Sequence, residues 1–578
     1  MKPDDDDYAP TANSKALSLL FAYAAENNLH LSSMDIEAAF LTADLEPGAE
    51  LYIRLPRNIY EDPDRPHQYG KLNKSLYGLR RAPKLYNAEL TAHLISGGYS
   101  RSEHDRCLFY KRETGSDTFI AFVIHVDDFA IASSDPALTA QLKAHLEIKY
   151  TIAVEEFLES FTGIHVHYTH IKSPTHEKET KFMNLSQPGH LKKIYEHFDL
   201  TDATTKAPST PMASTYDLQQ VLGDGAGSEK CDVTEYRKAL GILIYILRTR
   251  PDVAFAINTL AQRTAVCTNN DYTALKRVAR YLHGTHAKTL CFPCHSQIQA
   301  RETIKLIAWC DASFANLEGS RSQTGVCFAL GKTGPMFYCK SKVQQTVSLS
   351  STESEVNAAT DAAQDIIWFR NVLEELGSKQ AEATTLFSDS ASMIALATRY
   401  SGNHKRIRHF TTKVNFLIQQ VEDKMIDIVH LAGTEMPADL LTKALPTGSF
   451  EKHTKRILEG SAKENKDTTH IHTSHCSHTT HTTLVAEMLT HSPLHVYHNS
   501  YSQPPGGKGI LKENKQTRRI TYEQDSASPY DTRERGEMFD KARLPFYTQE
   551  YVIDEPPCSP YIITFLKHKR VKPKSKQL

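Results

Sequence analysis

Residues 119–134 read FIAFVIHVDDFAIASS, with two adjacent aspartates between two apolar runs. A hairpin is the simplest explanation, because aspartate favours turns and each apolar run suits a strand. Asp127 and Asp128 nevertheless place two negative charges side by side, and carboxylates about 4 Å apart repel by roughly 4 kcal/mol at a surface-like dielectric. A divalent cation would remove that repulsion, and such a site would need a third carboxylate elsewhere in the chain.

The composition bounds the class of protein. A chain of 578 residues suggests about three or four domains. Lys and Arg number 67 against 68 Asp and Glu, so any nucleic-acid binding must come from local basic patches. The start MKPDDDDYAP does not resemble a secretion signal, and no apolar run is long enough to span a bilayer. The ten scattered cysteines fit a reducing compartment.

The first part of the chain predicts an α+β fold around a mainly antiparallel sheet. Apolar patterning favours strands at 29–36, 51–55, 108–113 and 118–126, and helices at 81–99 and 136–150. Asp35 lies near the end of the first strand and is the candidate third carboxylate. The alternative role for Asp35 is a helix N-cap, which is common where a strand passes into a helix.

The later part of the chain predicts helices and then a second α/β unit. Helices are expected at 235–267, broken at Pro251, and at 271–285. Residues 302–446 then predict three successive strands, a long helix, a strand, a helix, a strand and a closing helix. These elements are expected at 304–313, 324–331, 335–342, 350–377, 384–390, 390–398, 423–431 and 437–445.

Four carboxylates recur at the ends of these later elements. Asp311 ends the first strand, Glu355 opens the long helix, Asp389 ends the fourth strand and Asp439 opens the last helix. Each has a simpler reading, since Glu355 could complete a capping box with Thr352, and the aspartates could be caps. Four caps converging at strand and helix ends is a less economical explanation than one acidic site.

These motifs resemble a known family. MDIEAAFLTADLE (34–46), KLNKSLYGLRRAPKLYN (71–87) and HVDDFAIA (125–132) are similar, in order and spacing, to the reverse transcriptase of copia-type LTR retrotransposons. YRKALGILIYILRTRPDVAFAIN and RVARYLHGT resemble the thumb and connection of that family. SRSQTGVCFALG, SLSSTESEVNAA, LFSDSAS and MPADLLTKALP resemble its ribonuclease H domain, so the likeness to this Pol polyprotein region covers about 11–446.

The resemblance implies an α+β reverse transcriptase palm with truncated fingers, a helical thumb and connection, and an α/β ribonuclease H-like domain. The expected ranges are 1–165 for partial fingers and palm, 166–301 for thumb and connection, and 302–447 for the ribonuclease H-like domain. Residues 448–578 combine a His/Thr-rich stretch with a basic end and predict a disordered tail.

The resemblance also implies roles for individual residues. Asp35, Asp127 and Asp128 would hold two Mg²⁺ ions in the palm, and Phe40 would exclude a ribose 2′-hydroxyl. An ordinary core position is the alternative for Phe40. Tyr77 and Gly78 lie in the segment that packs against the incoming nucleotide and template in the family.

In the second unit, the resemblance implies a ribonuclease H site that also holds two Mg²⁺ ions, with Mn²⁺ as a substitute. Its carboxylates would be Asp311, Glu355, Asp389 and Asp439, with Glu353 as the alternative to Glu355. The implied partners are an RNA template, a DNA primer, an RNA–DNA hybrid and deoxynucleoside triphosphates, without a membrane. The implied location is intracellular, in a cytoplasmic particle or the nucleus.

Some features depart from the family pattern. His125 replaces the usual Tyr, Arg81 the usual Gln and Tyr86 the usual Trp. The family's N-terminal fingers strands are not found ahead of the palm motifs, which indicates a fragment of a Pol polyprotein. The enzyme interpretation therefore has a rival, in which the chain is a non-catalytic or co-opted Pol remnant that binds nucleic acid.

Overall fold

The computed structural model describes residues 8–55, 69–113, 118–172, 179–200, 206–213, 229–294, 304–331, 333–399, 410–460, 510–513 and 520–523. Most of the predicted tail lies outside these residues. The chain divides into a unit of residues 1–472 and a unit of residues 473–578, and the second contains a two-stranded ladder of β18 (Ile510–Glu513) and β19 (Ile520–Glu523). Within the described residues, no helix is both long and apolar enough to cross a bilayer.

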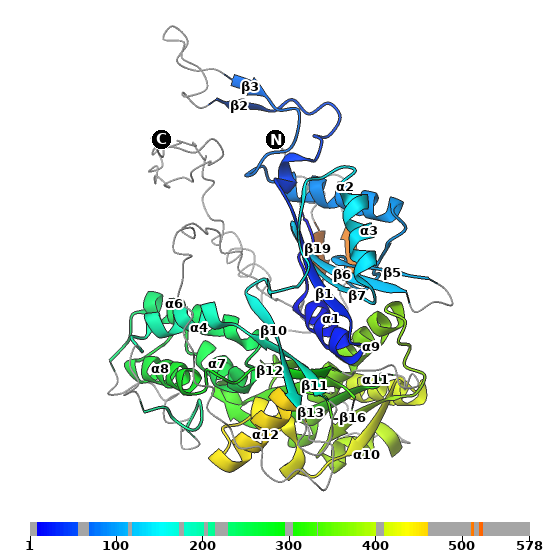
Figure 1. The fold of residues 1–578 in the computed structure, drawn as a ribbon. Helices are drawn as coiled ribbons and strands as arrows, with labels where there is room; N and C mark the ends of the chain where they lie inside the picture. The colour runs from blue at the N-terminus through cyan, green and yellow to red at the C-terminus, as the bar shows by residue number, and fades with distance from the viewer. Residues whose placement is uncertain are drawn as a thin grey trace. The chain divides into compact units, whose positions relative to one another are not determined.

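The palm is a six-stranded antiparallel sheet with the order β4-β5-β6-β7-β1-β8. Residues 119–134 form its two central strands, β6 and β7, and Figure 1 shows helices α2 and α3 over this sheet. The elements are β1 (His30–Ile36), β4 (Ser100–Arg101), β5 (Leu108–Arg112), β6 (Phe119–His125), β7 (Asp128–Ser133), β8 (Ile152–Glu155), α2 (Ala82–Ser96) and α3 (Pro136–Leu146).

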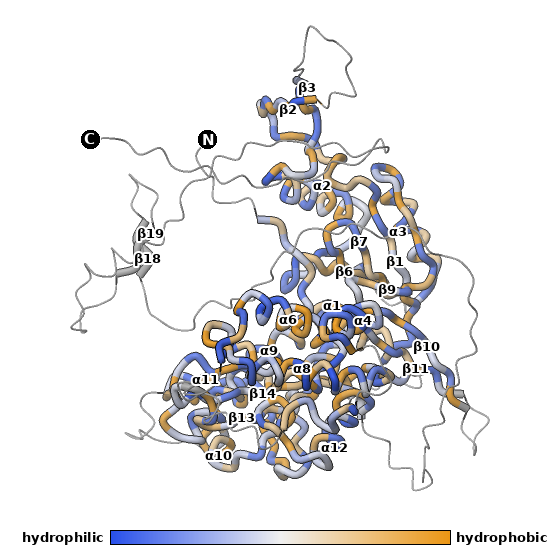
Figure 2. The backbone as a smooth tube through the Cα atoms, turned by 90° about the vertical axis from the view of Figure 1, so that its left-hand side faces the viewer, coloured by the Kyte–Doolittle hydropathy of each residue, from blue (hydrophilic) through white to orange (hydrophobic). Residues whose placement is uncertain are grey.

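Both faces of the palm sheet are covered, and this explains why β6 and β7 are apolar except at their ends (Figure 2). Successive side chains of a strand point to opposite faces. Phe122 and its neighbours on one face pack with α2 and α3, whereas Ala121 and Val123 on the other face join the core around α1 (Ser14–Glu26). The register is therefore strongly specified, because a shift by one residue would move the side chains of each face into the core on the opposite face.

A second antiparallel sheet, with the order β12-β11-β10-β9, was not predicted. It combines β9 (Ser160–Phe161), β10 (Ile164–Lys172) and β11 (Glu179–Ser186) with the distant β12 (Leu290–Cys294). The helices beside it are α4 (Pro188–His197), α6 (Val233–Tyr245), α7 (Ala254–Ala261) and α8 (Asn269–Gly284), with the short turns η3 (Ile246–Arg248) and η4 (Pro251–Val253). The expected helices are confirmed, but the expected boundary at 165 falls inside β10, so this region is not purely helical.

A disulfide joins Cys231 to Cys267, ahead of α6 and α8. Scattered cysteines had suggested reduced thiols, so this pair departs from the expectation. The two residues are 36 positions apart, and a backbone bridge between Lys230 and Thr268 brings them together, with the Cys231 amide donating a 3.3 Å hydrogen bond to the Cys267 carbonyl.

The third sheet, in the region where the resemblance implies a ribonuclease H-like unit, has the order β15-β14-β13-β16-β17, antiparallel from β15 to β13 and parallel from β13 to β17. Its elements are β13 (Leu306–Leu317), β14 (Arg321–Leu330), β15 (Met336–Val343), α9 (Ser351–Glu375), β16 (Thr384–Ser388), α10 (Ala391–Arg399), α11 (Thr411–Glu422) and β17 (Ile426–His430). The expected closing helix is instead a 3₁₀ helix, η8 (Pro437–Leu441), and α12 (Thr447–Glu459) follows it. The ordered chain thus continues past the expected boundary at 447.

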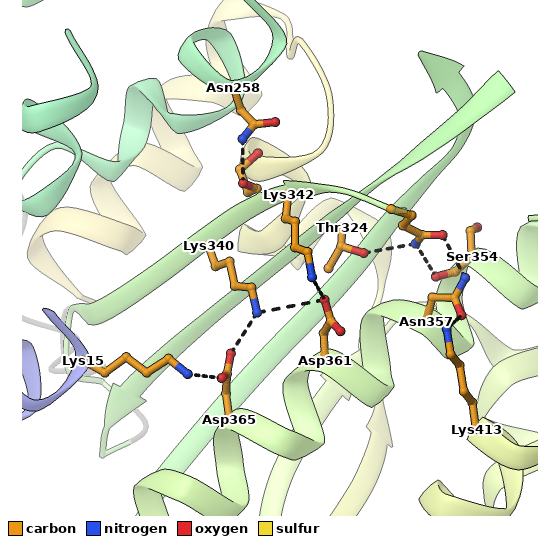
Figure 3. A network of polar contacts seen from close by, with 12 residues as sticks. Lys15, Asn258, Thr324, Lys340, Lys342, Ser354, Asn357, Asp361, Asp365 and Lys413 are labelled. Atoms are coloured by element: carbon orange, nitrogen blue, oxygen red, sulfur yellow. Dashed lines mark hydrogen bonds and ion pairs between the residues drawn. The ribbon is translucent and has the colours of Figure 1, made fainter. Parts of the chain in front are cut away.

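Helix α1 connects the palm sheet to the ribonuclease H-like unit. Lys15 forms an ion pair with Asp365 on α9, and Lys340 reaches the same carboxylate at 3.4 Å (Figure 3). The Tyr23 hydroxyl donates a hydrogen bond of 2.9 Å to the carbonyl of Leu376. These contacts bury the apolar face of α1, which belongs to the same hydrophobic core as β6, β7, β13 and α9.

Candidate active sites

The strand register brings two palm carboxylates face to face. Asp35 on β1 pairs with Asp128, the first residue of β7, and the next strand along is β8. Asp35 is therefore an inner residue of a strand, and the N-cap alternative is wrong. Asp127 lies in the two-residue turn between β6 and β7, and its carbonyl accepts a 3.2 Å hydrogen bond from the Ile36 amide.

The turn that carries Asp127 has a strained backbone. Val126 has a φ of 66°, a conformation that β-branched residues rarely adopt. Two-residue hairpin turns need positive φ because only then does their twist match that of the strands. The cost is of the order of 1–3 kcal/mol and persists only where the surroundings demand that geometry. Here the demand is a tight turn that presents two adjacent aspartates at the sheet edge.

The palm carboxylates are electrostatically unfavourable as they stand. Burial raises the pKa of Asp128 to about 6, and the nearby charges of Asp127 and Asp35 add to the rise. Burial also raises the pKa of Asp127, again with a contribution from Asp35. Their ligand atoms do not form a group within 4.8 Å of one another, although they surround one edge of the sheet.

Aromatic rings lie beside the palm carboxylates. Phe40, on η1 (Ala39–Leu41), is half-buried and meets Tyr77 at 4.9 Å and the buried Tyr86 at 5.8 Å between ring centroids. Burial raises the pKa of Tyr77, and Asp127 and Asp35 contribute, so Tyr77 faces the acidic edge. Gly78 has a φ of 97° in the turn closed by the Leu79 amide on the Leu76 carbonyl, which suits glycine.

The second acidic site is tighter. Asp311 on β13, Glu355 on α9 and Asp389 just after β16 each offer an oxygen within 4.8 Å of the others. Parallel pairing of β13 with β16 brings the two aspartates to the same end of the sheet, and α9 lies across it. The structure therefore brings together three of the four residues predicted for this unit.

The fourth predicted residue, Asp439, lies beside this group on η8 rather than within it. Burial raises the pKa of Asp439 to about 7, with Asp311 as the next cause. Burial likewise raises the pKa of Glu355 to about 9, with contributions from Asp311 and Asp389. Such shifts mean that burial, together with the neighbouring carboxylates, disfavours the ionised forms of Asp439 and Glu355.

The capping-box alternative for Glu355 is wrong. The N-cap of α9 is Ser350, whose hydroxyl accepts from the Glu353 amide, while the Glu353 carboxylate accepts from the Leu349 amide at 2.7 Å. Glu353, the fallback candidate, thus serves the helix end and leaves Glu355 for the acidic group. One carboxylate oxygen of Glu355, Oε2, is buried without a hydrogen-bond partner in the described part of the chain.

Sequence reasoning missed three residues around this group. The Thr442 hydroxyl donates to Asp311 Oδ2, and the Lys443 ammonium lies 3.0 Å from Asp439 Oδ1 and 3.6 Å from Asp311 Oδ2. Gly325 pairs with Asp311 across β13 and β14, and a Cβ there would meet the Ala438 carbonyl oxygen at 2.8 Å. The only signal was their place in the quoted motifs TGVCFALG and PADLLTKAL, because their contacts with Asp311 and with η8 join distant parts of the chain, apart from that of Lys443 with Asp439.

Comparison with known proteins agrees with this arrangement. A family model described as "Reverse transcriptase (RNA-dependent DNA polymerase)" matches residues 3–214. The Retrovirus-related Pol polyprotein from transposon TNT 1-94 of Nicotiana tabacum is 30% identical over 451 residues, which cover 77% of this chain and 32% of that protein. The corresponding polyprotein from transposon RE1 of Arabidopsis thaliana is 29% identical over 455 residues, covering 78% and 29%.

More distant relatives and structures match as well. The Transposon Ty1-BR Gag-Pol polyprotein of Saccharomyces cerevisiae is 25% identical over 459 residues, covering 77% of this chain and 24% of its own. A solved structure of LC11-RNase H1, isolated from compost, covers 26% of this chain and 96% of its own at 17% identity and a TM-score of 0.19. That score is too low to add to the strand order already described.

The matched region spans less than a third of each polyprotein. The order of the motifs, the palm hairpin and the sequence relationship over more than three quarters of the chain agree with one another. The chain therefore belongs to the copia/Ty1-type retrotransposon Pol polyprotein family and carries its reverse transcriptase region at residues 3–214.

Proposed function

We propose that this chain is an RNA-directed DNA polymerase joined to a ribonuclease H. The observation that carries the proposal is that two separate groups of carboxylates are built around two different sheets. Asp35, Asp127 and Asp128 lie where β1, β6 and β7 of the palm sheet meet, and Asp311, Glu355, Asp389 and Asp439 lie around the third sheet.

Both groups suit divalent cations. Hard cations such as Mg²⁺ take carboxylate oxygens, and the donors here are all carboxylates. The Oε2 of Glu355 has no hydrogen-bond partner in the described part of the chain, and Asp311, Glu355 and Asp389 each offer an oxygen within 4.8 Å of the others, so these residues fit a divalent cation. We infer two Mg²⁺ per site, replaceable by Mn²⁺; when bound, they would stabilise the negative charge that develops on the phosphoryl group being transferred or hydrolysed.

In the palm, the chain's own residues would align the reactants. Asp35 and Asp127 would hold the cations against the primer 3′-hydroxyl and the incoming deoxynucleoside triphosphate, with Asp128 as the third carboxylate. Phe40, supported edge-on by Tyr77 and Tyr86, would lie beneath the sugar and exclude a 2′-hydroxyl. The exposed Tyr77–Gly78 turn would contact the nucleotide and the RNA template.

Around the third sheet, cations would be held at a phosphate of the RNA strand by Asp311, Glu355, Asp389 and Asp439. The substrate would be an RNA–DNA hybrid, whose 2′-hydroxyls and groove shape distinguish it from duplex DNA. The resemblance that supports this reading also implies an intracellular site of action, in a cytoplasmic particle or the nucleus.

The two sites should be separable, and this tests the proposal. Asp127→Asn in the full chain should abolish Mg²⁺-dependent primer extension on an RNA template and leave hybrid cleavage within a few-fold of the original. Asp311→Asn should do the reverse, because each substitution removes one charged ligand from only one group. The measurement is a gel of labelled primer and labelled hybrid for both variants, with folding checked by circular dichroism.

A loss of both activities in either folded variant would contradict the assignment of two independent sites. If the original chain folds and binds hybrid but extends no primer and cleaves no RNA, the chain is instead a non-catalytic Pol remnant that binds nucleic acid.

A further inference from the structure

Lys443 places a positive charge inside the second acidic group. It follows η8, four residues after Asp439, and its Nζ lies 3.0 Å from Asp439 Oδ1 and 3.6 Å from Asp311 Oδ2. The Asp311 side chain is only 2% exposed, whereas that of Lys443 is 39% exposed. The ammonium therefore reaches a buried carboxylate from a position that remains open to solvent.

An ordinary surface ion pair would not explain this geometry. Exposed pairs four residues apart contribute little, and they bridge two solvated groups. Lys443 instead joins carboxylates from two separate elements, β13 and η8. Its charge also acts on the other two members of the group, since it lowers the pKa of Glu355 and Asp389 against the stronger effect of burial and neighbouring carboxylates.

The backbone of Lys443 is held while its side chain is not. Its amide donates a 3.1 Å hydrogen bond to the Asp439 carbonyl, and the preceding Thr442 hydroxyl is bound to Asp311. Only the flexible stem needs to rotate for the ammonium to leave the group. A lysine suits such a movement, because its ammonium is a compact charge without the fixed two-pronged geometry of arginine.

We propose that Lys443 is an internal counter-ion, which stabilises the four carboxylates in the metal-free protein and withdraws when divalent cations bind. This role rests on the proposed metal site and adds a competitor to it. The ammonium keeps the acidic group assembled before loading, and it weakens metal binding because its charge must be displaced. Lys443 is thus a positioning residue that lowers the affinity of the site for divalent cations.

Metal affinity tests this directly. The full chain with Asp35→Asn and Asp127→Asn, which weaken the palm site, would be titrated with Mn²⁺ and free Mn²⁺ followed by electron paramagnetic resonance. Lys443→Met should bind Mn²⁺ about tenfold more tightly, because one opposing charge has gone. Lys443→Arg, which keeps the charge, should stay within a few-fold of the parent chain.

A matched control separates local from general effects of charge. Lys305→Met removes an ammonium from an exposed pair with Glu382 (2.8 Å) in the same unit, and should leave the affinity unchanged. Without metal, Lys443→Met should melt at a lower temperature than the parent chain, and saturating Mn²⁺ should close that gap. A variant that is unfolded without metal and folds when Mn²⁺ is added would support the same role.

Unchanged or weaker Mn²⁺ binding by folded Lys443→Met would overturn the counter-ion role, as would a variant that stays unfolded in saturating Mn²⁺. Asp311→Asn in the same background distinguishes this from failure of the site itself. If the parent chain shows no Mn²⁺ binding that Asp311→Asn removes, the metal site and the counter-ion role are both wrong. If that binding is present and insensitive to Lys443, only the counter-ion role is wrong.

Discussion

Replacing Glu355 by Gln should stabilise the metal-free protein while it abolishes hybrid cleavage. The Glu355 carboxylate is buried between Asp311 and Asp389, so its ionised form is costly. Glutamine has nearly the shape of the protonated acid, can still accept from the Ala312 amide and can donate to a neighbouring carboxylate. The substitution therefore removes the repulsion without leaving a cavity.

The size of the stabilisation expected for Glu355→Gln follows from the raised pKa of Glu355. Burial and the neighbouring aspartates raise the pKa of Glu355 from 4.5 to about 9. At about pH 7.5 the folded protein must take up a proton that the unfolded chain does not carry, which costs about 1.4 kcal/mol for each of about three pH units. The upper bound on the gain from Glu355→Gln is therefore about 4 kcal/mol in the free energy of unfolding.

The stability of the metal-free protein should fall as pH rises. A carboxyl group whose pKa is raised in the folded state binds more protons there than in the unfolded chain, so stability falls as pH rises. This loss begins above the ordinary value of 4.5 and continues to about 9. The advantage of Glu355→Gln should thus be near zero at about pH 4.5 and grow by about 1.4 kcal/mol per pH unit.

Tryptophan fluorescence can follow this unit selectively. The chain has two tryptophans, Trp309 on β13 and Trp368 on α9, and both belong to the ribonuclease H-like unit. Urea unfolding would be measured with a chelator and with saturating Mg²⁺ between about pH 5 and 8.5. Mg²⁺ should stabilise the original chain more than Glu355→Gln, because the variant lacks one charged ligand.

Glu374→Gln provides the control, since Glu374 lies on the same helix but is exposed beside Lys379. It should change stability by less than about 0.5 kcal/mol at any pH. The reasoning would be refuted if Glu355→Gln destabilised the metal-free protein, or if its advantage did not grow with pH.

Three further outcomes are expected. Phe40→Ala should raise ribonucleotide incorporation relative to deoxyribonucleotide incorporation in primer extension; an unchanged ratio in an active variant would return Phe40 to the core. Gly325→Ala should weaken Mn²⁺ binding and hybrid cleavage together, because its Cβ would push η8 away from Asp311, and unchanged binding would argue against that close approach. Arg250→Met should lower the free energy of unfolding in urea by about 3–5 kcal/mol, because the fully buried Asp252 carboxylate loses its two hydrogen bonds from the guanidinium (2.8 and 2.9 Å). A loss below about 1 kcal/mol would contradict this.

Local patterns in the sequence were sufficient for much of the fold. Apolar periodicity and helix-stop residues predicted α2, α3, α9, the palm strands β1, β5, β6 and β7, and the strands of the third sheet within a few residues, whereas the palm strands β4 and β8 were not predicted. The position of Asp127 in a turn and of Asp389 just after a strand also followed from local order, because a strand and the turn after it are specified by neighbouring residues. The expectation that Asp311 ends its strand is wrong, since β13 continues to Leu317 through its pairing with β14. The roles of these carboxylates came from the family resemblance and remain predictions.

Long-range packing decided the rest. Strand β12 joins β11 across about a hundred residues of chain, and no local signal marks that pairing. Contacts between distant segments also cover the two faces of the palm sheet, with α2 and α3 on one face and α1 on the other. The Cys231–Cys267 pair is likewise a contact between distant segments. Lys443 and Gly325 acquire their significance only when η8 packs against β13 and β14, because the charge of one and the missing side chain of the other matter only beside Asp311.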